Sequence, residues 1–217
     1  MAQFSWHNSI GMKKAALTFA TLACVLVQAA TAQEQSSTYT DLDLSKCKHT
    51  PSREPEDYGS WRCRGYAGVA VLVGGADQRT TVSFGPRAAS EPASSQTLPG
   101  FNSVDKTKIE WRLAGPKGEG KPFATIIRWH VKLEEDGKAS RGRVLVVTSL
   151  GKSVCHIGYV DGLANPDANA LARQMADTHA RRFDCGKDTR MIAGKQGESV
   201  KNISLDPEPE PTSAPSR

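Results

Sequence analysis

The amino-acid sequence predicts an α+β domain, in which an antiparallel β-sheet carries one carboxy-terminal α-helix and disulfides add stability. Apolar and polar residues alternate through much of residues 109–160, as in strands with one buried face. Helical spacing replaces this alternation after residue 165, and four cysteines lie outside the amino-terminal leader. We expect about six strands, arranged as a meander that is partly closed or sandwich-like, with the helix packed on the sheet.

The first 32 residues are predicted to be an export signal rather than part of the fold. Lys13 and Lys14 precede the uncharged run AALTFATLACVLV, and Ala30-Thr31-Ala32 supplies the small residues that a signal peptidase requires. Because the run is too short to span a bilayer, cleavage after Ala32 is expected to release a periplasmic or secreted protein. We expect no transmembrane span in the mature chain.

Two alternatives concern this leader. The unusual composition of residues 1–11 suggests that translation truly begins at Met12. Acylation of Cys24, which follows Leu22-Ala23, would instead anchor the protein through a lipid. Simple export is favoured because the apolar run continues beyond Cys24.

The mature chain is only mildly basic. Cleavage of the leader would remove Lys13 and Lys14 but no acidic residue. The mature chain would then contain 26 of the 28 basic residues and all 23 acidic residues. A net charge of +3 is too small to indicate nucleic-acid binding, and we expect no nucleic-acid partner.

Composition divides the mature chain into three parts. Residues 33–38 are polar and are expected to be an unstructured start. Residues 39–196 are predicted to form a single exported domain, long enough to bury a core. In residues 197–217 Pro alternates with Glu and few apolar side chains remain, which predicts a disordered tail.

Four cysteines in an exported chain predict a disulfide framework. Three connectivities are possible, and the order along the chain favours Cys47–Cys63 and Cys155–Cys185. We expect no metal site, because there is no CxxC and Cys155 is adjacent to His156, which places the two side chains on opposite faces of a strand. No cofactor is expected.

Two turns set the predicted register of the last three strands. Asp136-Gly137 suits a two-residue type I′ turn, which aligns Trp129 with Val144. A second two-residue turn at Gly151-Lys152 would give the third strand the same apolar face. On this register Cys155 lies opposite Thr148, on the face that carries Trp129.

The helix is predicted to cover that face. Asn165 is a favourable cap, and Pro166 is favourable as the first helical residue. A bridge between Cys155 and Cys185 would then fasten the end of the helix to the sheet. We expect the amino-terminal hairpin to cover the opposite face, whose apolar residues are Ile126, Leu145 and Val147.

The same register brings five cations together on the face away from the predicted helix. This cationic cluster consists of Arg128, His130, Lys132, Arg141 and Arg143. Like charges directly opposite each other destabilise a sheet, so the cluster requires countercharge or full exposure to solvent. Countercharge could come from a bound anion or from the acidic residues Glu110, Glu134 and Glu135.

No catalytic residue is predicted. The chain contains no GxSxG, HExxH or GxGxxG, and the Gly-Lys-Ser of residues 151–153 lacks the earlier glycine of a phosphate-binding loop. The sequence therefore favours a non-catalytic bacterial envelope protein that binds an anionic component or another envelope protein through the cationic cluster. The alternative is a small envelope hydrolase, with a site near His156 or in the loop of residues 85–104.

Overall fold

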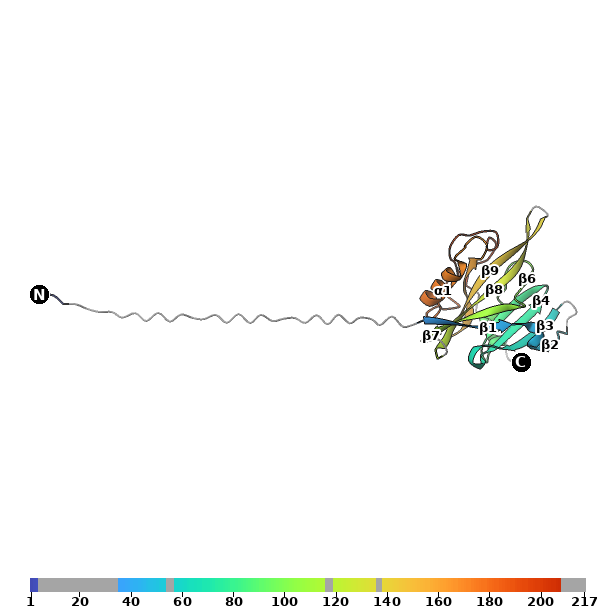
Figure 1. Cartoon of the computed structure of the whole chain (residues 1–217), viewed down its shortest axis with the longest axis horizontal. Coiled ribbons are helices and arrows are strands. Elements are labelled where there is room, and N and C mark those ends of the chain that lie inside the picture. Colours follow the sequence, from blue (N-terminus) through green and yellow to red (C-terminus); the bar gives the residue numbers. More distant parts are fainter. Residues whose placement is uncertain (4–34, 54–56, 116–118, 136–137, 208–217) are drawn as a thin grey trace, which may run out of the picture. The chain divides into compact units, whose positions relative to one another are not determined.

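The computed structural model describes residues 1–3, 35–53, 57–115, 119–135 and 138–207. The predicted leader lies outside these residues, apart from its first three. Within residues 35–207 the chain forms three layers: a large β-sheet, an α-helix on one of its faces and a smaller β-sheet on the other (Figure 1). The predicted α+β class and antiparallel pairing are confirmed.

The larger sheet, sheet A, contains seven of the eleven strands that the described residues form. Its order is β1-β7-β8-β9-β10-β11. Strand β6 pairs with residues 130–131 of β8, a part of β8 that does not pair with β7. Pairing is antiparallel except between β10 and β11. Its strands are β1 (Gln35–Leu42), β6 (Asn102–Ser103), β7 (Thr107–Ala114), β8 (Lys121–Glu135), β9 (Lys138–Leu150), β10 (Val154–Asp161) and β11 (Met191–Ile192).

The smaller sheet, sheet B, is an antiparallel meander of four strands. These are β2 (Lys48–Thr50), β3 (Asp57–Arg64), β4 (Ala70–Ala76) and β5 (Arg79–Phe84). The helical elements are α1 (Ala168–His179) and the 3-10 turns η1 (Leu44–Lys46), η2 (Tyr66–Gly68), η3 (Ala88–Ser90) and η4 (Pro92–Ser94). Asp77 and Gln78 connect β4 to β5 with positive φ, the conformation that a type I′ turn requires.

The expected strand number and the expected unstructured start are both wrong. Several strands, such as β6, are too short to show a period of two in the sequence. Strand β1 begins at Gln35, so the residues from 35 to 38 belong to sheet A. Backbone pairing with β7, from Gln35–Ala114 to Leu42–Thr107, holds this polar strand in place without deep burial of most of its side chains.

The predicted pairing of β8 with β9 is confirmed. Trp129 lies opposite Val144 and Ile127 opposite Val146. The pairing continues to Glu135 and Lys138, which leaves two residues for the turn, as a two-residue hairpin requires.

The predicted pairing of β9 with β10 is wrong by one residue. The connection contains three residues, 151–153, so Cys155 lies opposite Ser149 rather than Thr148. A β-bulge just before Gly158 shifts the register once more. Because side chains alternate along a strand, a shift of one residue moves Cys155 to the other face of the sheet.

The two layers that cover sheet A are consequently exchanged relative to the prediction. Helix α1 covers the face that we assigned to the amino-terminal hairpin, and sheet B covers the face that we assigned to the helix. The helix-side core includes Ala124, Ile126, Leu145, Val147, Cys155, Ile157, Ala172 and Met175. The core between the sheets includes Val71, Val73, Phe84, Trp111, Ile127, Trp129, Val146 and Tyr159.

Both predicted disulfides are confirmed. Cys47 bonds Cys63, with their Cα atoms 4.6 Å apart, and so ties the start of β2 to β3. Cys155 bonds Cys185, with their Cα atoms 5.9 Å apart, and so ties β10 to the segment that follows α1. The second bridge does fasten the helical layer to the sheet, on the face opposite to the predicted one.

The domain extends past its predicted end at residue 196. Val200 is buried, and Ile203 and Leu205 pack against the core between the sheets. Ser199 N donates to Asp161 Oδ2 at 3.1 Å, which joins this segment to the end of β10. The tail prediction is therefore wrong for residues 197–207, because three spaced apolar side chains suffice to dock them; residues 208–217 lie outside the described chain.

Gly158 lies where α1 and β11 meet the bulge of β10. A Cβ atom at this position would lie 2.5 Å from the Met191 carbonyl oxygen and 2.6 Å from Met175 Sδ. Gly158→Ala is expected to lower the free energy of unfolding by about 1–3 kcal/mol through overpacking, measured by urea denaturation. Gly151→Ala is the control, since its Cβ would approach no atom closer than 3.2 Å; equal losses in the two variants would contradict this packing argument.

Candidate binding cleft

The cationic cluster lies on strands β8 and β9 of the hairpin, and its member Arg128 contacts α1. As predicted, Lys132 lies opposite Arg141 and His130 opposite Arg143, and these four side chains are exposed. The predicted face is wrong, however. Arg128 Nη2 donates to Asn169 Oδ1 of α1 at 3.0 Å, which places the cluster on the helix side of sheet A.

The expected countercharge from Glu110 is not available to the cluster. Its carboxylate accepts a hydrogen bond from Ser37 Oγ at 2.5 Å and from Arg173 Nε at 2.6 Å, and it lies 4.0 Å from Arg112 Nη1. The side chains of Glu134 and Glu135 lie outside the part of the chain that the structure describes. Among the described side chains, none forms an ion pair with His130, Lys132, Arg141 or Arg143.

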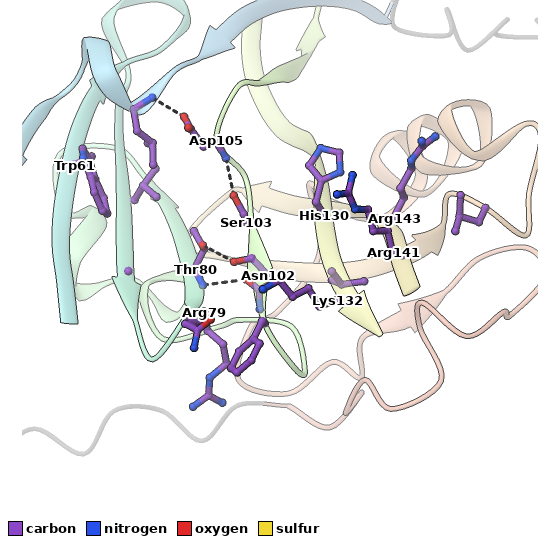
Figure 2. A pocket seen from close by; sticks show the side chains of 18 residues that line it. Trp61, Arg79, Thr80, Asn102, Ser103, Asp105, His130, Lys132, Arg141 and Arg143 are labelled. Atoms are coloured by element: carbon purple, nitrogen blue, oxygen red, sulfur yellow. Dashed lines mark hydrogen bonds between the residues drawn. The ribbon is translucent and has the colours of Figure 1, made fainter. Parts of the chain in front are cut away.

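These four residues belong to the lining of a cleft of about 840 Å³, which also includes residues of sheet B, of β6 and of the segment that follows β10. Arg128, the fifth member of the cluster, does not line it. In Figure 2, Trp61 and Thr80 lie on one side of β6, and His130, Arg141 and Arg143 lie on the other. Arg79, at the start of β5, adds another cation and forms a 3.0 Å ion pair with Asp77.

The cleft also exposes apolar side chains. The exposed fractions of Phe101 and Leu163 are 42% and 55%, although both are large apolar residues. The Lys132 ammonium lies 5.4 Å from the centre of the Phe101 ring, within the range of a cation–π contact. Further apolar lining comes from Leu44, Trp61, Val73 and Val131.

The polar groups at β6 are already hydrogen-bonded within the protein. Asn102 Oδ1 accepts from Thr80 N at 2.9 Å, and its amide nitrogen donates to the Leu98 carbonyl at 2.9 Å. Asp105 Oδ1 accepts from Leu44 N at 3.0 Å. These contacts shape the wall, whereas His130, Lys132, Arg141 and Arg143 form no ion pair with a side chain that the structure describes.

Sequence reasoning did not find Arg79, Phe101 and Leu163. They come from the start of a strand and from two connecting segments, and only the tertiary fold places them beside the hairpin. Neither a residue pattern nor strand pairing could have indicated their proximity. The four cations, by contrast, belong to one hairpin, so its register was sufficient.

His156 does not have the environment of a general base. It is 1% exposed, and its ring packs edge-on against Trp129 and Tyr159, each with ring centres 5.8 Å away. Burial, with a further contribution from the positive charge of Arg190, lowers the pKa of His156 to about 3. The structure therefore does not favour a hydrolase centred on His156, because a substrate has no access to this ring.

The loop of residues 85–104, the other hydrolase candidate, is anchored on β10. Glu91 Oε2 accepts from Val154 N at 2.9 Å and Gln96 Oε1 accepts from His156 N at 2.7 Å. Both side chains satisfy backbone donors at the edge of β10 that β11 does not reach. The loop thus has a structural role in covering a sheet edge.

The described ranges contain no cluster of three or more His, Cys, Asp or Glu side chains with the arrangement of a metal site. Within the same ranges, α1 and every other helix are too short or too polar to cross a bilayer.

The chain was also compared with known proteins. No protein-family model, no curated protein and no solved structure matches it.

Proposed function

We propose that this protein is a non-catalytic, exported binding module of the cell envelope, which recognises an anionic partner through the cationic cluster. The observation that carries this proposal is the cleft in which His130, Lys132, Arg141 and Arg143 lie together, without an acidic partner among the described side chains. Facing cations repel each other across a strand pair. A bound anion would relieve that repulsion, so binding and stability of the hairpin would be coupled.

The chemistry of the cluster suits phosphate or carboxylate ligands. Arg141 and Arg143 each present a planar fork of N–H donors, which matches the oxygens of such anions in pairs. Lys132 adds a flexible point charge. Because these side chains are exposed, binding should weaken as salt screens the charges.

Two features support an extracytoplasmic location. Disulfides form and persist in oxidising compartments, and this domain contains two of them. The leader predicted over residues 1–32 would direct the chain there, with cleavage after Ala32.

Charge reversal at β9 tests the proposal. Arg141→Glu/Arg143→Glu is expected to reduce retention on isolated envelope fractions by about tenfold or more at low salt, because two attractive charges become repulsive. Retention of the unmodified protein should itself fall between low and moderate salt.

Arg62→Glu/Arg64→Glu is the matched control for this experiment. Both residues are exposed on β3, outside the cleft lining, and the pair changes the net charge by the same amount. If the two double variants lose retention equally, only net charge matters and the cleft is not the binding site. Unchanged retention of Arg141→Glu/Arg143→Glu would also eliminate it.

A further inference from the structure

We infer that the cleft binds a single-chain anionic amphiphile, with a phosphate or carboxylate head on the cations and an apolar tail on the apolar lining. This inference rests on the proposed function and specifies the class of ligand. It draws on the exposed apolar side chains, the size of the cleft and the hydrogen bonding of its walls.

The exposed apolar side chains are concentrated at the cleft. Among the residues of 35–207 whose exposure the structure describes, the strongly exposed large apolar residues are Tyr39, Phe101 and Leu163, and the last two line the cleft beside the cations. Exposed apolar surface next to unpaired charge is typical of a site for a ligand with both characters. A purely polar anion would leave Phe101 and Leu163 without a function.

The size of the cleft fits one molecule of modest size. Its volume of about 840 Å³ lies within the range of about 300–1,000 Å³ that is usual for small-molecule sites. Phe101 and Leu163 belong to the same lining as the cations, so the tail and the head of one ligand would contact neighbouring parts of one cleft.

The hydrogen bonding of the walls favours an acyl chain over a peptide. A peptide would bring backbone N–H and C=O groups that require partners when they are buried. Near β6 these partners are already used: Thr80 N donates to Asn102 Oδ1, and Lys132 N donates to the Phe101 carbonyl at 2.8 Å. An acyl chain has no such requirement.

The experiment is isothermal titration of the mature domain with ligands below their micelle concentration. The ligands are lysophosphatidylglycerol, a fatty acid of equal chain length, lysophosphatidylcholine, glycerol phosphate and an acidic peptide. We expect at least one anionic amphiphile to bind about tenfold or more tightly than glycerol phosphate and than the zwitterionic lipid of equal chain length. The difference from glycerol phosphate measures the contribution of the apolar tail to affinity. The difference from the zwitterionic lipid measures the contribution of the net negative charge of the head.

The matched variants separate this inference from the proposed function. Phe101→Ser/Leu163→Ser should abolish the advantage of the amphiphile over glycerol phosphate and leave salt-dependent retention on envelope fractions intact. Tyr39→Ser, at an exposed apolar residue outside the cleft, should change neither.

Three other outcomes would contradict the inference, and one of them would also contradict the proposed function. Equal affinity for glycerol phosphate and the anionic amphiphiles would overturn the inference and leave the proposed function standing. Tighter binding of the acidic peptide would replace the amphiphile by a protein partner. Absence of binding by every anion, together with unchanged retention of Arg141→Glu/Arg143→Glu, would overturn both.

Discussion

Replacing Arg112 by leucine should lower the free energy of unfolding by about 3 kcal/mol, because it breaks a buried ion network between α1 and sheet A. Arg112 is 6% exposed and donates to both carboxylate oxygens of Asp177, from Nε at 2.9 Å and from Nη2 at 2.7 Å. Its Nη1 also donates to Ser37 Oγ on β1. Removal of the guanidinium leaves Asp177 facing an apolar side chain and leaves Glu110 with one cation fewer.

Urea denaturation at neutral pH measures this loss. Lys108→Leu is the control, because its ion pair with Asp41 is exposed, at 68% and 70% of the two side chains, so solvent screens it and its loss should change stability far less. Arg112→Leu/Asp177→Leu should recover part of the stability, since the unpaired carboxylate is gone. A loss below about 1 kcal/mol for Arg112→Leu would contradict the assignment of this network as a fastener of the helix.

Acidification should destabilise the fold through His156. Burial lowers its pKa from 6.5 to about 3, so between these values the unfolded chain binds a proton that the folded chain excludes. The stability associated with neutral His156 is complete above pH 6.5 and is lost as the pH falls toward 3. The expected slope is about 1.4 kcal/mol per pH unit within this window, or roughly 2–3 kcal/mol by pH 4.5.

The measurement is the free energy of unfolding at several pH values between 7 and 4.5, roughly the upper part of this window. His156→Gln removes the titrating group, so its stability should vary less with pH than that of the unmodified protein, whatever its absolute value. His179→Gln, at an exposed position of α1, should retain the full slope. Identical pH profiles for His156→Gln and the unmodified protein would refute the role of His156.

The β8–β9 hairpin shows what the sequence could predict of this fold. Its two-residue turn and its alternation agree, so the pairing of Trp129 with Val144 and of Lys132 with Arg141 followed from counting. The same counting found four of the cations that line the cleft. The disulfides followed from the order of the cysteines along the chain.

Strand β10 shows where counting residues between turns gives the wrong register. A third residue in the connection and a bulge before Gly158 leave no trace in the hydrophobic pattern, yet together they decide which side chains face the helix. The sequence predicted that both faces of sheet A are covered and assigned each cover to the wrong face. Phe101 and Leu163 could not be placed at the cleft for a related reason, since connecting segments have no period.

The position of β1 also bears on how a newly made chain reaches this state. Trp111 Nε1 donates to Thr40 Oγ1 across 71 residues of sequence, and all of sheet B lies between the two partners. Closing so long a loop is entropically costly and slows folding. The amino-terminal strand therefore remains without its neighbour until β7 has emerged, and during that interval it is open to chaperones and proteases.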